Sequence, residues 1–130
     1  CGGIAELVKT AYQTLVDRGY SKEMAYFGTL YELRGIAELY HAMDIDGMYA
    51  NVSETARFGG LKNGKRIIDS HVRQNMEKVL DELESGVFMK EFEKESQSGF
   101  AWTKKALDSE KSEDINHTGD RVRTRFRIAP

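Results

Sequence analysis

Residues 21–43 read SKEMAYFGTLYELRGIAELYHAM and decide the fold. Ser21 belongs to the residue types that cap helices, and Glu23 follows in the first turn, where a carboxylate meets the positive end of the helix dipole. The apolar members of the stretch occupy more than one helical face; they are Met24, Phe27, Leu30, Tyr31, Ile36, Tyr40 and Met43. The pattern predicts one long helix over 22–43 that is apolar around most of its girth and therefore central in a core.

Amphipathic segments flank this helix on both sides. Residues 4–15 carry apolar side chains at i, i+3, i+4 and i+7, and Gly19 is placed to end that helix in a left-handed conformation. An apolar stripe that ends near Gly86 is formed by Ile68, Val72, Met76, Val79, Leu80 and Leu83. Phe88 and Phe92 then indicate a short further helix.

Three other stretches predict breaks between helices. Residues 44–47 predict a turn, and a shorter helical segment follows it to about Phe58. The dipeptides Gly59-Gly60 and Asn63-Gly64 predict a loop over 59–64, because glycine is the main breaker of regular structure in a chain so poor in proline. Residues 103–117 are charged and weakly periodic, which favours a mobile connection.

The C-terminal end fits two patterns. Arginines alternate with other residues over 121–128, which is typical of a strand; the set is Arg121, Val122, Arg123, Thr124, Arg125, Phe126, Arg127 and Ile128. Read as a helix, the same stretch pairs Val122 with Phe126 at i, i+4. No second convincing strand is present to pair with, and the only proline is Pro130, so no helix interior contains a breaker. We therefore expect a helix here and an all-α fold.

Composition places the chain among soluble globular proteins. Its 130 residues fit one domain, expected to span 1–130, and 31% charged with 40% apolar residues excludes a disordered class. A net charge of −2 offers no electrostatic argument for nucleic acid or an anionic membrane surface. No apolar run approaches the roughly 20 residues of a membrane span, and the given residues contain no basic-then-apolar pattern of the signal-peptide kind, so neither feature is expected.

The first residue and the cysteine content bear on origin and compartment. Cys1 is the only cysteine, so an intrachain disulfide is impossible and a reducing compartment is expected: the cytoplasm, or an organelle stroma or matrix in a eukaryote. A first residue other than methionine indicates a processed or truncated product. We therefore expect a missing N-terminal part.

Glu32 is the residue of greatest chemical interest. On the predicted helix its neighbours at i−4, i−3, i+3 and i+4 are Gly28, Thr29, Gly35 and Ile36, with no lysine or arginine among them. Two interior glycines cost about 1 kcal/mol each relative to alanine, which suggests a close approach of backbone or ligand. One interpretation is a carboxylate at a metal or substrate site. The other, which spacing alone favours, is a solvent-facing glutamate beside tolerated glycines.

Other polar motifs carry weaker signals. Ser53, with Thr55 nearby, can offer a hydroxyl at a polar site, although such residues near a helix start more often cap it. A zinc site is not expected from the spacing of His41, His71 and His117. Residues 44–47 lack the remaining ligands of a calcium loop. The terminal arginines have no interleaved stacking aromatics, so a solvated face is favoured over nucleic-acid binding.

Several ordered motifs resemble one enzyme family. Residues 19–27, GYSKEMAYF, followed by Leu30 and 32–34, resemble the helix of ketol-acid reductoisomerases that supplies metal-binding glutamates. Residues 1–3 with Leu7-Val8 and Leu15-Val16 resemble the stretch before it. Ser-Glu-Thr-Ala at 53–56 and Phe-Gly at 58–59 resemble the family's Ser-Asn-Thr-Ala element and its Tyr-Gly sequel. Met76, Val79-Leu80 and 85–88 match its later helix and turn, and the likeness is loose after Phe92.

The resemblance implies a specific reaction. Enzymes of this family convert 2-acetolactate or 2-aceto-2-hydroxybutyrate into 2,3-dihydroxy acids with NADPH and two Mg2+ ions, on the way to valine and isoleucine. It also implies an architecture: a Rossmann domain, absent from residues 1–130, binds the nucleotide, and a knotted helical domain completes the site. In the short-chain class two such domains intertwine as a homodimer, so each site draws on both subunits.

Carried over by position, the resemblance assigns roles to particular residues. Glu32 matches a magnesium-binding glutamate, Ser53 matches the serine that contacts the substrate carboxylate, and Val52 and Ala56 line the pocket beside it. The family's second glutamate, one turn earlier, is Gly28 here, and its usual histidine is Tyr31. The first metal-binding aspartate and glutamate of the family lie upstream of its cysteine-glycine-glycine element, so no catalytic set is complete in this chain.

Two hypotheses from different classes remain. The first is the C-terminal domain of a ketol-acid reductoisomerase, inactive as a fragment and binding Mg2+ weakly or not at all. The second is a diverged, inactive relative that acts as a helical dimerisation module, which Gly28 favours. An unrelated helical adaptor is a distant third.

Overall fold

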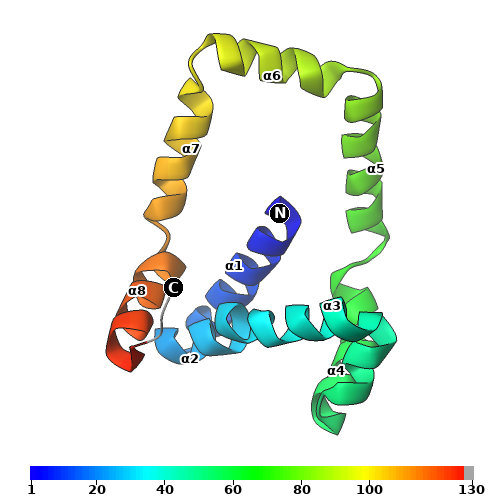
Figure 1. Ribbon diagram of the computed structural model, residues 1–130, viewed down its shortest axis with the longest axis vertical. Helices are drawn as coiled ribbons and strands as arrows, with labels where there is room; N and C mark the ends of the chain where they lie inside the picture. The colour runs from blue at the N-terminus through cyan, green and yellow to red at the C-terminus, as the bar shows by residue number, and fades with distance from the viewer. Residues whose placement is uncertain (128–130) are drawn as a thin grey trace. The chain divides into compact units, whose positions relative to one another are not determined.

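The computed structural model describes residues 1–127, and every regular element within them is helical (Figure 1). This confirms the predicted all-α class. Among these elements one is a π-helix, the five-residue turn η1, and the others are α-helices. In chain order the elements are α1 (Gly2–Asp17), α2 (Lys22–Tyr26), η1 (Phe27–Tyr31), α3 (Glu32–Asn51), α4 (Glu54–Ile67), α5 (Ser70–Glu84), α6 (Val87–Gln97), α7 (Ala101–Lys111) and α8 (Asp114–Phe126).

The junction between α1 and α2 forms as the sequence predicts. Gly19 has a φ of 87°, and the next N–H, from Tyr20, donates to the carbonyl of Leu15 at 3.1 Å. This is the glycine-dependent ending that satisfies carbonyls left over at a helix C-terminus. Ser21 Oγ then accepts the N–H of Met24 at 3.2 Å and caps α2. Both predicted boundary residues are confirmed.

The prediction of one regular α-helix over 22–43 is wrong at its centre. The N–H of Glu32 donates to the carbonyl of Phe27, five residues back, whereas an α-helix closes over four. Gly28 and Thr29, which stand inside this turn, are both poor helix formers, so the α-helical register is weakly enforced there. One extra residue is therefore accommodated between α2 and α3.

The turn predicted at 44–47 is confined to a single residue. Asp44 adopts φ 56° and ψ −164°, a conformation rarely open to a residue with a side chain, and the helix continues after it to Asn51. Gly47 makes the kink possible, because a Cβ at this position would clash with the Cβ of Met43. The kink therefore combines an obligatory glycine with a strained aspartate.

Replacing Asp44 with glycine is expected to stabilise the folded chain by about 1 kcal/mol. The strained backbone costs about 1–3 kcal/mol, of which glycine's extra freedom in the unfolded chain cancels about 0.5–1 kcal/mol. Thermal unfolding followed by circular dichroism measures the change. Gly47→Ala is the matched control and should destabilise, because its Cβ meets Met43. A loss of stability in Asp44→Gly would contradict the assignment of strain to this residue.

The loop predicted at 59–64 is wrong, because these residues belong to α4. Gly60 lies against Tyr49, where a Cβ would come within 3.1 Å of the ring. Arg57, one turn earlier, donates from Nε to the carbonyl of Tyr49 at 2.6 Å and from Nη2 to that of Ala50 at 3.0 Å. The glycines of this segment thus serve close packing between the end of α3 and α4 rather than a loop.

The prediction of a mobile connection over 103–117 is also wrong. These residues form most of α7 and the start of α8. The carboxylate of Glu95 accepts the N–H of Thr103 at 2.8 Å and so satisfies a free donor in the first turn of α7. The predicted C-terminal helix is confirmed as α8 to Phe126, and Ile128 lies outside the described residues.

Contacts divide the chain into two compact units, Cys1–Met48 with Asp108–Pro130 and Tyr49–Leu107. The core of the first unit joins α1, α2 and α8, and its buried members are Tyr12, Ala25, Tyr26, Ile115 and Val122. Gly119 is required there, since a Cβ would lie 2.9 Å from the Tyr26 ring. Chain segments about a hundred residues apart therefore form one packed unit.

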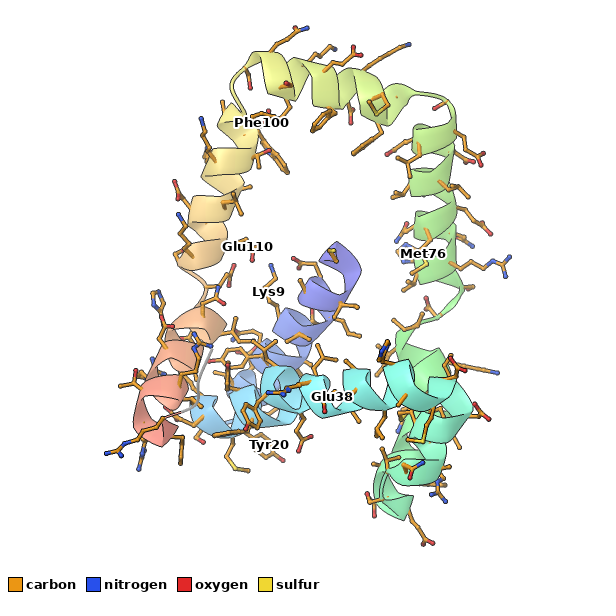
Figure 2. All side chains as sticks on the ribbon, viewed as in Figure 1. Lys9, Tyr20, Glu38, Met76, Phe100 and Glu110 are labelled. Carbon is orange, nitrogen blue, oxygen red and sulfur yellow. The ribbon has the colours of Figure 1, made fainter. Side chains whose placement is uncertain are left out.

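A polar network fixes α8 to α1 and α2. Asp114, at the start of α8, accepts the hydroxyl of Tyr12 at 2.6 Å and the ammonium of Lys22 at 2.7 Å. The Tyr12 hydroxyl also lies 3.0 Å from that of Thr118, which is fully buried. The hydrogen bonds from Lys22 and then Tyr12 lower the pKa of Asp114 below its ordinary value of 3.8. A further ion pair of 2.8 Å joins Lys9 and Glu110 (Figure 2).

Stability is expected to fall in acid because of Asp114. Its pKa is lower in the folded chain than in the unfolded chain, so its contribution is present above pH 4 and is lost as the pH falls through the folded-state pKa. Asp114→Asn should lower the free energy of unfolding by about 1–2 kcal/mol at pH 7, where the carboxylate is charged and its hydrogen bonds are strong. At pH 2 the substitution should have little effect. Urea unfolding at both pH values measures this. Asp81→Asn, on exposed α5, is the control, and an equal loss at both pH values would contradict the prediction.

The second unit lacks an interior of its own. No residue within 49–107 is buried, although α5 and α6 are amphipathic. On the predicted stripe of α5, Met76, Val79 and Leu80 remain more than half exposed. Figure 2 labels Met76 on this helix. The predicted central position of residues 22–43 is likewise wrong for a single chain, since Met24 is 64% exposed and only Ala25 and Tyr26 in that range are buried. Large apolar faces are thus left uncovered within each unit.

Candidate functional site

Glu32 stands at the first turn of α3, directly after the π-helical turn η1. Its side chain is exposed and makes no hydrogen bond or ion pair with any residue of 1–127. A carboxylate held in this way is available to an external ligand, and π-helical turns occur frequently at functional sites. The structure thus agrees with both interpretations of Glu32, a ligand-binding carboxylate and a solvent-facing one.

The surroundings of Glu32 differ from the expected α-helical geometry. Gly28 precedes it, and a Cβ built on Gly28 has nothing within 4 Å. Because the backbone bond at this turn spans five residues, the two positions are offset from the simple i, i+4 stack of an α-helix. Thr29 Oγ1 donates to the carbonyl of Ala25 at 2.7 Å and helps to satisfy the backbone where the register changes. Space therefore exists beside Glu32 for a larger side chain at Gly28.

Ser53 is the N-cap of α4, and its hydroxyl oxygen accepts the N–H of Ala56 at 3.2 Å. The cap uses the oxygen as an acceptor, which leaves the hydroxyl hydrogen free to donate. The side chain is exposed, and the N-terminus of a helix favours a negative group, although Glu54 already stands in the first turn. Val52 is half-buried and Ala56 is exposed. This set suits the recognition of a carboxylate by a hydroxyl donor.

The two parts of the predicted site lie in different units. Glu32 belongs to Cys1–Met48 and Ser53 to Tyr49–Leu107. Their convergence therefore stays a prediction. Arg57 was not predicted from the sequence. Its guanidinium donates to the carbonyls of Tyr49 and Ala50 and so fixes the backbone that leads into Ser53. Its position four residues after a helix-capping serine was the available signal.

The described residues do not furnish a magnesium coordination sphere. No group of three or more histidine, cysteine, aspartate or glutamate side chains that could hold a metal occurs in 1–127. Magnesium requires several oxygen ligands in near-octahedral geometry, and Glu32 alone offers one carboxylate. The three histidines, His41, His71 and His117, are exposed.

The terminal arginines make contacts within their own unit. Arg121 donates to Thr118 at 2.8 Å, and Arg123 donates to Tyr26 at 3.1 Å and pairs with Asp120. Arg121 and Arg123 thus stabilise the first unit, which the prediction of a purely solvated arginine face did not include. Within 1–127, no helix has both the length and the apolar character needed to cross a membrane.

Comparison with known proteins gives consistent results over nearly the whole chain. A model of the ketol-acid reductoisomerase C-terminal domain matches residues 1–127. The ketol-acid reductoisomerase (NADP(+)) of Chloroherpeton thalassium is 42% identical over 123 residues, which cover 95% of this chain and 36% of that protein. The one of Methanocaldococcus jannaschii is 41% identical over 123 residues, which cover 95% of this chain and 37% of that protein.

A solved structure shows the same fold. The NADH-preferring ketol-acid reductoisomerase from an uncultured archean matches with a TM-score of 0.92 and 31% sequence identity, over 95% of this chain and 38% of that chain. Residues 1–130 thus span 36% to 38% of the length of these relatives. The chain belongs to the family of ketol-acid reductoisomerase C-terminal domains.

Proposed function

We propose that this chain serves as the helical domain of an enzyme that isomerises and reduces 2-acetolactate or 2-aceto-2-hydroxybutyrate. The observation that carries the proposal is the match of residues 1–127 to the C-terminal domain of enzymes with that activity. The relatives are named as NADP(+) enzymes, and the solved structure is of an NADH-preferring enzyme. In the proposed reaction a nicotinamide nucleotide therefore supplies the hydride. It binds through a Rossmann domain, and a reducing compartment such as the cytoplasm suits a chain with a single cysteine.

Within this proposal, Ser53 recognises the substrate. Its free hydroxyl hydrogen donates to the substrate carboxylate, while Val52 and Ala56 line the pocket beside the carbon skeleton. The exposure of Ser53 and its position at the start of α4 support this role. Glu32 faces the same pocket from the other subunit, because the carboxylate and the reacting oxygens of one small substrate must be bound together.

The proposed assembly is an intertwined homodimer. It is supported by the second unit, Tyr49–Leu107, which contains no buried residue. Ordering a residue costs about 1–2 kcal/mol of backbone entropy, and apolar burial is the main term that offsets this cost. A second copy of the chain is the surface that allows α4–α7 to stay folded.

The Mg2+ ions of the family do not fit the residues of this chain alone. One carboxylate at Glu32 with Gly28 beside it cannot replace the water that the ion must lose. The upstream aspartate and glutamate of the family are needed as well. The fragment by itself is therefore inactive, and any metal site belongs to the whole enzyme.

A chimera tests the role of Ser53. The N-terminal part of the Chloroherpeton thalassium enzyme, joined to this chain, should oxidise NADPH in the presence of 2-acetolactate. Ser53→Asp keeps the helix cap but places a charge against the substrate carboxylate, so KM should rise at least about tenfold, which corresponds to 1.4 kcal/mol. Ser53→Asn, which also caps well, should have a smaller effect. Thr55→Asp is the matched control, and an equal rise in KM there would contradict the assignment.

The second candidate function is an inactive helical dimerisation module. Gly28 favours it, because the family's glutamate is lost at this position. The same chimera separates the candidates. Turnover that appears in the chimera, with or without Gly28→Glu, supports the enzyme. A chimera that dimerises and folds but shows no turnover in either form supports the module.

A further inference from the structure

An aromatic groove between α6 and α7 has no role in the proposed reaction. It encloses about 510 Å3, and it is lined by Phe88, Glu91, Phe92, Glu95, Trp102 and Thr103. Trp102, the only tryptophan of the chain, is 72% exposed. Large aromatic side chains are rarely left in contact with water together on a soluble surface unless a partner covers them.

The groove has a fixed shape and a negative charge. Glu95 accepts the N–H of Thr103 at 2.8 Å, which joins the two helices across the left-handed corner at Gly99 and Phe100. Phe100 is labelled at this corner in Figure 2. That hydrogen bond lowers the pKa of Glu95, so its carboxylate is ionised. Glu91 adds a second carboxylate, and no lysine or arginine among residues 1–127 lines the groove. Such a surface fits an apolar segment that also carries positive charge.

The C-terminal part of α4, residues 58–67, has the complementary character. Phe58 and Leu61 are 66% and 60% exposed. Lys62 lies over the Phe58 ring, with Nζ 5.3 Å from its centre, and Lys65 and Arg66 follow in the last turn. The only acidic residue of α4 is Glu54, at its opposite end. This segment, the basic end of α4, is therefore both apolar and positively charged.

We infer that the basic end of α4 from one copy of the chain occupies the α6–α7 groove of a second copy. The inference rests on the proposed homodimer and names the surfaces that meet in it. Both surfaces belong to the unit Tyr49–Leu107, which lacks a buried interior, and both are exposed within one chain. A twofold axis turns one such contact into two identical ones, so four uncovered surfaces are buried together.

Charge reversal tests the contact in the 130-residue chain. Glu91→Lys and the pair Lys62→Glu/Lys65→Glu should each weaken dimerisation about tenfold, as measured by sedimentation over a dilution series. Combining the three changes should restore most of the affinity, because opposite charges face each other again. Glu93→Lys, an exposed acid on the same helix that does not line the groove, is the matched control and should change little.

Trp102 reports on the groove independently. Its fluorescence should move to shorter wavelength as the chain associates, and Glu91→Lys should shift that transition to higher concentration. A chain that stays monomeric throughout overturns the proposed homodimer and the inference together. A dimer in which Trp102 emission does not change, or in which Glu91→Lys and Glu93→Lys behave alike without rescue, overturns only the assignment of the groove.

Discussion

Replacing Met76 and Leu80 with aspartate is expected to leave the chain monomeric and to unfold much of α4–α7. Both side chains stand on the apolar stripe of α5 and are more than half exposed in the single chain. Nothing inside Tyr49–Leu107 is buried in their place, and in the proposed homodimer this unit is buried against another copy. A carboxylate at each position would have to be buried without a partner, at a cost of several kcal/mol. The helix content should therefore fall together with the dimer.

Sedimentation and far-ultraviolet circular dichroism at the same concentrations measure the two effects. Lys78→Glu, on the same helix but off the apolar stripe, is the control and should preserve both the dimer and the helix content. The unaltered chain should also show a melting temperature that rises with concentration, because association stabilises only the folded state. A compact monomer of the unaltered chain at micromolar concentration would refute the expected dimer.

Local patterns predicted several helix ends correctly. The ending of α1 at Gly19 and the cap of α2 at Ser21 depend on residues within one turn, and both form as expected. The apolar stripe that ends near Gly86 corresponds to α5, which runs over Ser70–Glu84. These features require only the period of the helix and the chemistry of a cap or a glycine, which a sequence shows directly.

The errors occur where distant residues decide the structure. Gly60 was predicted to lie in a loop because glycine is common there. In the structure it is a helical residue whose lack of a side chain makes room for the ring of Tyr49. Residues 103–117 look unstructured because the groups that fix them come from elsewhere: Glu95 caps α7, while Tyr12 and Lys22 hold the start of α8. Such contacts cannot be read from the periodicity of a segment that has few apolar residues.

The candidate site was predictable in part. Ser53 is a helix cap, as its residue type indicates, and its substrate role comes from the family resemblance. Glu32 was identified by its position between glycines, but the π-helical turn before it was not, since Gly28 and Thr29 indicate only a weak helix. The meeting of Glu32 with Ser53 involves two units and, in the proposal, two chains. No pattern within one chain encodes that geometry by itself.

Restoring a glutamate at Gly28 is expected to strengthen Mg2+ binding in the chimera with the Chloroherpeton thalassium N-terminal part. Magnesium loses its water reluctantly and is held by hard oxygen ligands, so a second carboxylate beside Glu32 should raise the affinity at least about tenfold, or 1.4 kcal/mol. The new side chain has room, because a Cβ on Gly28 meets nothing within 4 Å.

Calorimetry of Mg2+ binding can separate the effect of charge from the effect of helix propensity. Gly28→Gln has nearly the shape of Gly28→Glu and the same benefit of about 1 kcal/mol for replacing a helical glycine, but it adds no negative charge. It should therefore leave the Mg2+ affinity near that of the unaltered chimera. Glu32→Gln in the Gly28→Glu background should abolish most of the gain, because the two carboxylates act on one ion and their effects do not add. Tight Mg2+ binding by the isolated chain with Gly28 in place would contradict this account, since it would require ligands other than the pair at 28 and 32. A gain from Gly28→Gln equal to that from Gly28→Glu would instead assign the effect to the folding of the η1 turn.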